Sequence, residues 1–172
     1  NKIQNLVLDV DGVMTTGHFF YDEKGKKLKI FGPDDNDALS ILSKYLKIVF
    51  VTGDKKGFKI SQRRIKIDMG FNLHLVSTIK RVEWIKKNLG LSETIYIGDG
   101  IFDYIVMKKV KYSIATANAD PLCKKYANYT TKRNGGERAV SEACLHILKK
   151  FFKIKSIENI ELRGKFSGEW NA

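Results

Sequence analysis

The chain has 172 residues, 43% of them hydrophobic, and its 31 Lys and Arg outnumber its 19 Asp and Glu to give a formal net charge of +12. This length fits one domain, and no apolar run approaches the roughly 20 residues that cross a bilayer. The basic residues stand as scattered doublets, such as Lys55-Lys56 and Lys149-Lys150, rather than in the cluster that nucleic-acid binding requires. We therefore expect neither a membrane nor a nucleic-acid partner, and a positive field that attracts anionic substrates.

The sequence also indicates a compartment. Residues 1–12 contain two acids and no sustained apolar core, so no signal peptide is predicted. Cys123 and Cys144 lack the spacing of a metal site and do not suggest a secreted disulfide framework. These features predict a cytoplasmic protein.

Strand-like and helix-like segments alternate along the chain. The expected strands are residues 3–8, 48–51, 73–76, 94–97, 111–114 and 129–131, and the expected helices are residues 35–45, 57–69, 78–88, 101–108, 120–127 and 138–152. This alternation predicts a Rossmann-like α/β fold, in which a parallel sheet has helices on both faces. The loops that follow the strands then meet at one sheet edge, where such folds bind ligands.

Residues 18–31 break the alternation. Two short strand-like runs flank a turn predicted at Lys24-Gly25, which indicates a β-hairpin. Because the hairpin directly follows an acidic motif at residues 9–12, we expect it to stand over that motif as a flap. The periodic pattern ends near residue 152, so the sequence predicts a single domain over residues 1–152 and a loosely ordered tail over residues 153–172.

The acidic motif places Asp9 and Asp11 after the apolar run Leu6-Val7-Leu8 and before Gly12. Side chains two apart on a strand point to the same side, so the two carboxylates would project together and repel unless a cation compensates. Magnesium takes oxygen ligands and suits that need. One Asp could then act as a nucleophile on phosphorus while the other moves a proton. Taken alone, the motif also fits an acidic turn after a buried strand.

Further polar residues fall where the later strands end. Thr52-Gly53 follows the second expected strand, Lys80 enters the helix after the third, and Asp99 and Asp103 follow the fourth. Each alone has an ordinary explanation, as a turn residue, a solvated lysine or a helix cap. Together they form a phosphate donor, a fixed cation and metal-holding acids at successive strand ends, which favours phosphoryl transfer.

These motifs resemble those of the haloacid dehalogenase superfamily of phosphohydrolases. The matching segments are DVDGV at residues 9–13, VTG at residues 51–53, Lys80, and GDGIFD at residues 98–103. Within the superfamily the chain looks like the small branch without a cap domain, typified by 3-deoxy-D-manno-octulosonate 8-phosphate phosphatase. The hairpin in place of a cap, Asp35, and the segment at residues 135–142 carry that finer resemblance.

The resemblance implies a role for each catalytic residue. Asp9 would attack phosphorus and form an aspartyl-phosphate, and Asp11 would protonate the leaving oxygen and then activate water. Thr52, Gly53 and Lys80 would hold the phosphoryl oxygens.

The same resemblance implies a magnesium site and substrate contacts. Asp9, the backbone carbonyl of Asp11, and Asp99 would bind Mg²⁺, with Asp103 in support. Asp35 and Arg138 would contribute to substrate binding. A site covered only by a hairpin also suggests that neighbouring subunits complete the enclosure, so we expect a homotetramer.

The chain departs from the branch pattern where the leaving group is recognised. Asp54 stands where the branch usually has Arg, and Glu137, Arg138 and Ser141 alter a loop that usually reads GGRGAVRE. Such arginines serve the anionic end of a sugar acid, and Arg pairs with carboxylates in a way that other residues do not reproduce. Whether Arg138, Lys55 or Lys56 replaces them stays open.

The leading hypothesis is therefore a magnesium-dependent phosphatase of a small phosphorylated sugar acid. Two alternatives remain: the same chemistry on another phosphomonoester, and a regulatory domain that has lost catalysis. A phosphate-accepting receiver domain also uses Asp, Thr and Lys, but its acceptor Asp follows a later strand than its acidic pair, which is the wrong order for this chain.

Overall fold

The computed structural model describes residues 2–160 and contains a six-stranded parallel sheet with the strand order β5-β4-β1-β6-β7-β8. The strands are β1 (Asn5–Asp9), β4 (Lys47–Thr52), β5 (Asn72–Leu75), β6 (Thr94–Gly98), β7 (Tyr112–Ala115) and β8 (Tyr129–Thr130). Every neighbouring pair is parallel. The predicted Rossmann-like α/β class is confirmed, and the described residues contain no cap domain.

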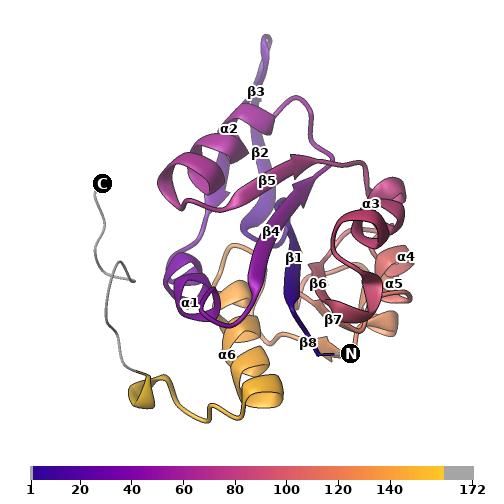
Figure 1. Ribbon diagram of the computed structural model, residues 1–172. Helices are drawn as coiled ribbons and strands as arrows, with labels where there is room; N and C mark the ends of the chain where they lie inside the picture. Colours follow the sequence, from indigo (N-terminus) through magenta and orange to yellow (C-terminus); the bar gives the residue numbers. More distant parts are fainter. Residues whose placement is uncertain (1, 161–172) are drawn as a thin grey trace.

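Helices cover both faces of the sheet (Figure 1). The helices α1 (Asp35–Leu42) and α6 (Ala139–Phe152) pack together on one face, and α2 (Phe58–Gln62) lies toward the same side. The other face carries α3 (Arg81–Asn88), α4 (Tyr104–Met107) and α5 (Pro121–Tyr126). Over residues 2–160, no helix is both long and apolar enough to cross a membrane.

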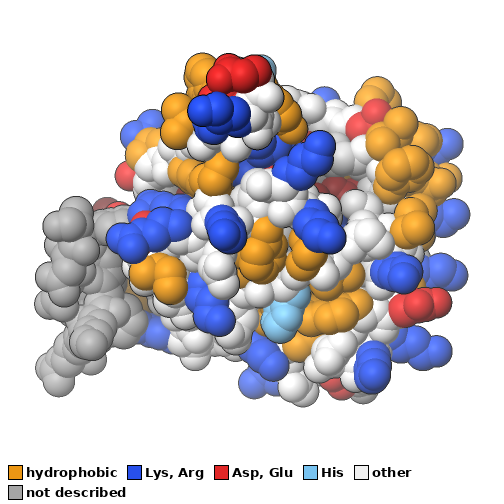
Figure 2. Space-filling model, turned by 90° about the horizontal axis from the view of Figure 1, so that it is seen from above, with side chains coloured by type: hydrophobic (Ala, Val, Ile, Leu, Met, Phe, Trp, Pro, Cys, Tyr) orange, Lys and Arg blue, Asp and Glu red, His pale blue; other side chains and the backbone are white. Residues whose placement is uncertain are grey.

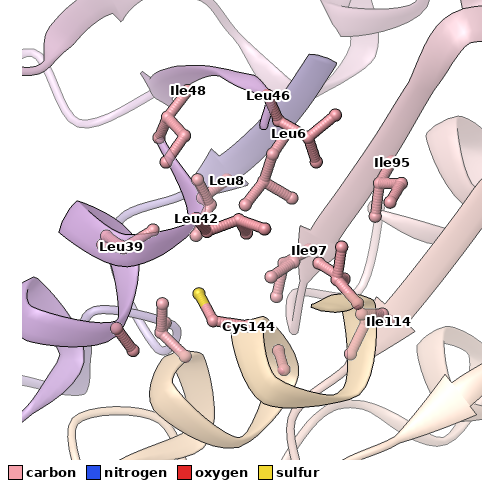
Figure 3. Packing of buried hydrophobic residues seen from close by; sticks show 14 of the residues in the cluster. Leu6, Leu8, Leu39, Leu42, Leu46, Ile48, Ile95, Ile97, Ile114 and Cys144 are labelled. Carbon is pink, nitrogen blue, oxygen red and sulfur yellow. The ribbon is translucent and has the colours of Figure 1, made fainter. Parts of the chain in front are cut away.

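The core forms because β1 is apolar on both sides. Leu6 and Leu8 point toward α1 and α6, whereas Val7 points toward α3 and α4, and all three are fully buried. Figure 3 shows Leu6 and Leu8 packed among Leu39 and Leu42 of α1, with side chains of α6 beside them. Each such buried side chain stabilises the fold by about 1.5–3 kcal/mol, so β1 is held firmly at the centre of the sheet.

The order of the strands determines where a ligand site can form. From β1 the chain proceeds to β4 and β5 on one side, and it then crosses to β6 and β7 on the other. Open α/β sheets bind ligands at such a reversal, beyond the carboxyl ends of the strands. The carboxyl end of β1, between those of β4 and β6, is therefore the expected position of a site.

A separate two-stranded hairpin rises from this edge of the sheet (Figure 1). It consists of β2 (Thr15–Asp22) and β3 (Gly25–Phe31), so it begins three residues earlier than expected. The turn is at Glu23-Lys24 rather than Lys24-Gly25, because Asp22 pairs with Gly25 and the Asp22 carboxylate accepts a hydrogen bond from the backbone N–H of Lys24 at 2.8 Å.

Several helices differ from their expected bounds. The helix expected from residue 101 begins at Tyr104, because the Asp103 carboxylate accepts the backbone N–H groups of Asp99 and Gly100 and holds residues 99–102 in a turn. The helix expected over residues 57–69 ends at Gln62 and continues as a π-helical turn. Of the expected tail, residues 157–159 form a 3₁₀ turn, and residues 161–172 lie outside the described part of the chain.

Candidate active site

Three carboxylates meet at the carboxyl edge of the sheet. Asp9 ends β1, Asp99 directly follows β6, and Asp103 precedes α4. One oxygen of each lies within 4.8 Å of the others. The sequence predicted this convergence, because each acid follows a buried strand whose end is fixed by the core. Clustered carboxylate oxygens are the ligands that a hard divalent cation such as magnesium prefers.

The electrostatics of the cluster also fit a cation. Burial, helped by the charges of Asp9 and Asp103, raises the pKa of Asp99 to about 8. Burial likewise raises the pKa of Asp9 to about 6, although Arg81 partly offsets this effect. Within the described structure, Oδ1 of Asp99 is buried and accepts no hydrogen bond. Fully ionised, the three acids would carry more negative charge than Arg81 neutralises, and one oxygen is available to a metal.

Gly12 allows Asp99 to reach this position. Its φ of +84° is in the left-handed region that side chains rarely adopt, and a Cβ at Gly12 would overlap the Asp99 carboxylate. The glycine of the acidic motif is therefore required both by its backbone conformation and by the carboxylate that packs against it.

Both carboxylate oxygens of Asp103 accept hydrogen bonds. Its Oδ1 accepts from Nη1 of Arg81 at 2.9 Å and from the hydroxyl of Tyr96 at 2.6 Å. Its Oδ2 accepts from the backbone N–H groups of Asp99 and Gly100 at 3.0 and 2.9 Å. Both oxygens are thus occupied, and Asp103 fits a supporting role that shapes the loop carrying Asp99.

The cation beside Asp9 is Arg81. Its Nη1 lies 2.8 Å from Oδ2 of Asp9 and its Nη2 lies 3.1 Å from Oδ1, and the residue is 1% exposed. Burial alone would lower the pKa of Arg81, but the nearby Tyr96, Asp9 and Asp103 raise it above its ordinary value, so the guanidinium stays charged.

The sequence had placed this cation at Lys80, and the structure corrects that placement. Lys80 is exposed, and its side chain makes no hydrogen bond or ion pair with residues 2–160; its backbone N–H donates to the carbonyl of Ser77. The physical reason is local. Residues Thr78–Lys80 form a 3₁₀ turn and α3 begins only at Arg81, so the side chain that is buried at the site belongs to Arg81, one residue later than expected. Because Lys80 and Arg81 are adjacent and both basic, the sequence alone does not indicate which of them faces the site.

Asp11 is not one of the three clustered acids, and its carboxylate has its own partners. Nζ of Lys29, on β3, lies 2.7 Å from its Oδ1 and 2.9 Å from its Oδ2. The buried Thr52 donates its hydroxyl to Oδ2 at 3.5 Å. The Asp11 carboxylate therefore lies close to the acid cluster but is oriented by a separate set of groups, which suits proton transfer better than metal binding.

Lys29 is the functional candidate that the sequence analysis missed. It is buried, whereas its neighbours Leu28 and Ile30 are exposed. Alternating apolar and polar residues on a strand normally predict the opposite arrangement, with the apolar side chains inside. No local signal could have identified Lys29, because its burial depends on the hairpin packing against α2.

Asp54, which stands where the branch usually has Arg, binds the hairpin. Nζ of Lys26 lies 2.6 Å and Nζ of Lys29 2.9 Å from its Oδ2. Burial alone would raise the pKa of Asp54, but the two lysines lower it to about 2. Lys55 and Lys56, considered as substitutes for the missing arginine, are both exposed.

The structure does not bring Asp35 to the acid cluster. Asp35 is 0% exposed and accepts a hydrogen bond from the backbone N–H of Ser141 at 2.8 Å, so it joins α1 to α6 inside the protein. Because Asp35 is fully buried, it cannot make the expected contact with a substrate, and it instead holds α1 and α6 together.

Arg138 is half-exposed at the start of α6 and forms an ion pair with Asp34. Gly53 is exposed beside Thr52, as the predicted phosphate loop requires.

The surface above the site is rich in positive charge. Figure 2 looks down on the hairpin and the carboxyl edge of the sheet, and it shows Lys and Arg side chains spread over this face with only a few acidic ones. A positive surface raises the local concentration of anionic ligands. The site therefore combines clustered carboxylates and a fixed guanidinium beneath a surface that attracts anionic ligands.

Comparisons with known proteins find relatives of this chain. A family model described as haloacid dehalogenase-like hydrolase matches residues 76–143. The 3-deoxy-D-manno-octulosonate 8-phosphate phosphatase KdsC of Salmonella typhi is 32% identical over 150 residues, which cover 83% of this chain and 78% of that protein.

Solved structures are similar over most of the chain. A probable YrbI family phosphatase from Pseudomonas syringae has a TM-score of 0.81 and 28% identity, covering 94% of each chain. A 3-deoxy-D-manno-octulosonate 8-phosphate phosphatase from Moraxella catarrhalis, solved with magnesium, phosphate and KDO, has a TM-score of 0.72 and 25% identity, covering 86% of each chain.

Proposed function

This chain belongs to the haloacid dehalogenase-like hydrolases and is a phosphatase, and from that premise we propose that it is a magnesium-dependent hydrolase of a small phosphorylated sugar acid, acting through an aspartyl-phosphate. The observation that carries the proposal is the convergence of Asp9, Asp99 and Asp103 within 4.8 Å, with Arg81 bound to the carboxylate of Asp9. A nucleophile, a cation and a metal-binding set thus meet at one point.

In the first half-reaction, an oxygen of Asp9 attacks phosphorus and forms a bond to it as the bond from phosphorus to the sugar oxygen breaks. Asp11 gives a proton to that leaving oxygen. In the second, Asp11 takes a proton from water, whose oxygen bonds to phosphorus as the bond to Asp9 breaks. Two moderate barriers then replace one high barrier.

Arg81 and Thr52 have the chemistry to hold the phosphoryl group. Arg81 binds both oxygens of Asp9 and leaves its buried Nε without a partner in the described structure. When a phosphoryl group arrives, its oxygens compete for the guanidinium N–H groups, which releases one oxygen of Asp9 for attack. A planar guanidinium suits this exchange because it binds phosphate as readily as carboxylate.

Magnesium would be held by Asp9, the backbone carbonyl of Asp11 and Asp99, with Asp103 in support. The free buried oxygen of Asp99 and its raised pKa fit a carboxylate that a cation completes. Bound there, magnesium would neutralise charge on the phosphoryl oxygens.

The proposed substrate class rests on the names of the relatives. Sequence differences between this chain and the branch pattern weaken the argument for that class. The relatives are named as 3-deoxy-D-manno-octulosonate 8-phosphate phosphatases, and the described residues of this chain have a hairpin and no cap domain, as the family resemblance implies. However, Asp54 already occupies Lys26 and Lys29, and Glu137 and Ser141 replace groups that serve the sugar carboxylate. Another sugar phosphate is therefore the second candidate.

The experiment is a panel of phosphate esters that includes 3-deoxy-D-manno-octulosonate 8-phosphate, assayed for released phosphate with Mg²⁺. We expect the sugar-acid ester to have the highest kcat/KM in the panel. A higher value for a neutral sugar phosphate would shift the assignment to the second candidate. If no ester is hydrolysed above the level of an Asp9→Asn variant, the proposal of catalysis fails and a regulatory domain takes its place.

A further inference from the structure

We propose that Lys29 of the hairpin is a positioning residue that orients Asp11 for proton transfer. The inference rests on the proposed role of Asp11 in phosphate ester hydrolysis. It assigns a function to a residue of β3 that lies outside the motifs and is joined to Asp11 by a largely buried ion pair.

The ammonium group of Lys29 is buried, and all of its hydrogen-bond donors have partners. Its side chain is 0% exposed, and Nζ lies 2.7 Å from Asp11, 2.9 Å from Asp54 and 2.8 Å from the hydroxyl of Ser61. A lysine ammonium has three N–H donors, and three acceptors surround it. These acceptors come from the end of β1, the loop after β4, and α2, so the contact fixes three segments to one point.

Because all three donors of Lys29 are engaged, the residue fits a positioning role rather than a substrate-binding role. Lys29 has no donor left for a phosphoryl oxygen or a sugar carboxylate, and Asp54 already balances the part of its charge that Asp11 does not. Lys26 differs: its Nζ contacts Asp54 at 2.6 Å and lies over the ring of Phe19 at 3.3 Å, and in the described part of the chain it makes no hydrogen bond or ion pair with Asp11. The two lysines that contact Asp54 therefore make different contributions.

The orientation of Asp11 depends mainly on Lys29. The other side chain that contacts its carboxylate within the described structure is Thr52, whose hydroxyl is 3.5 Å away, at the long limit of a hydrogen bond. Without Lys29, the Asp11 carboxylate loses its close partner and is free to rotate about its side-chain bonds. General acid catalysis requires the proton donor to lie within hydrogen-bond reach of the leaving oxygen, so such rotation would slow proton transfer.

The test uses two esters that need the acid to different degrees. An alkyl ester, the best sugar phosphate of the panel, has a strongly basic leaving oxygen that must be protonated, whereas p-nitrophenyl phosphate releases a weakly basic one. For Lys29→Met we expect kcat/KM to fall by about 100-fold on the sugar phosphate and by no more than about 10-fold on p-nitrophenyl phosphate. Lys27→Met, an exposed position on the same hairpin, should match wild type on both.

Two further variants guard the interpretation. Lys26→Met removes the other lysine that contacts Asp54 and should show no preferential loss on the sugar phosphate. In an Asp11→Asn background, Lys29→Met should cause no further loss, because the group it orients is gone. If Lys29→Met does not fold, Lys29→Gln, which keeps two N–H donors but no charge, is compared on the same two esters.

Two results would overturn the proposal. Equal losses on the two esters would mean that Lys29 supports the fold or binds phosphate. A further loss in the Asp11→Asn background would mean that Lys29 acts on something other than Asp11. Wild-type protein that hydrolyses neither ester would refute the proposed function itself, and the two failures are thereby distinguished.

Discussion

Arg81 and Asp9 form a two-point ion pair at the centre of the site, with Nη1 and Nη2 of the guanidinium each facing one carboxylate oxygen at 2.8 and 3.1 Å. The pair is buried, so neither group is compensated by water if the other is removed. Losing one partner of a buried pair typically costs about 3–5 kcal/mol. The pair therefore fixes the nucleophile and contributes to the stability of the loop that leads into α3.

The first prediction compares the two adjacent basic residues. Arg81→Met should lower kcat/KM by at least about 100-fold, because it removes the cation that faces the reacting carboxylate. Lys80→Met should change kcat/KM by less than about twofold, since an exposed side chain without partners contributes little. Steady-state kinetics on the best ester decide this, with melting temperatures recorded for both. A greater loss of activity for Lys80→Met would restore the assignment made from the sequence.

The second prediction concerns the nucleophile. Asp9→Asn keeps the shape of the side chain but removes its charge, so phosphatase activity should fall to background while the circular dichroism spectrum stays unchanged. Single-turnover assays with the best ester provide the measurement. A variant that retains more than about a tenth of wild-type turnover would exclude Asp9 as the covalent nucleophile, because losing such a group usually costs several orders of magnitude.

How far the sequence predicts this site depends on what positions each residue. Asp9, Thr52 and Asp99 were predictable, because each follows a buried apolar strand and parallel strands end at one edge. Arg81 was not, because the choice between it and Lys80 depends on whether one turn is 3₁₀ or α. Propensities do not resolve that difference.

Lys29 and Asp35 show the second limit. Each is a charged residue buried by a segment distant in sequence: Lys29 by Ser61 of α2 and by Asp11, and Asp35 by the backbone of Ser141, 106 residues further along the chain. Local patterns describe a strand or helix start correctly and yet carry no information about which distant element covers it. The fold class needs only the patterns, whereas these two placements need the packed tertiary structure.

The third prediction concerns metal binding and its pH dependence. Removal of Mg²⁺ by a chelator should abolish activity, its return should restore it, and Asp99→Ala should weaken binding. Because burial raises the pKa of Asp99 to about 8, magnesium must displace a proton at pH 7, so its affinity should increase as pH rises from 6 to 8. Titration calorimetry in two buffers of different ionisation enthalpy measures the number of protons released when magnesium binds. Full activity after exhaustive metal removal would contradict the mechanism.

The fourth prediction is self-association through the hairpin, expected as a homotetramer. Its strands expose large apolar side chains, with exposed fractions between 40% and 60%, namely Phe19, Phe20, Tyr21, Leu28 and Ile30. Exposed apolar surface of this kind marks interaction sites. Light scattering should report an oligomer, and replacing Phe20 and Leu28 by Ser should yield monomers, whereas a Lys111→Ser control should not. A fully active sample that is monomeric at micromolar concentration would refute the prediction.

The fifth prediction links Asp35 to stability. Burial raises the pKa of Asp35 to about 6 from 3.8, and the hydrogen bond from Ser141 only partly offsets it. A carboxyl whose pKa is higher in the folded state binds its proton more tightly there, so the fold loses stability as pH rises from about 4 to 6 and gains none back above that range. Two pKa units correspond to about 3 kcal/mol at most.

Asp35→Asn keeps an acceptor for the Ser141 N–H but has no charge to bury. The variant should therefore have a higher free energy of unfolding than wild type at pH 7.5, by up to about 2–3 kcal/mol, and the difference should shrink toward zero near pH 4. Urea denaturation at the two pH values measures it, with Asp37→Asn in the same helix as the matched control. A variant less stable than wild type at pH 7.5 would mean that the Asp35 carboxylate is stabilised by its surroundings, and the negative charge would then strengthen the link between α1 and α6.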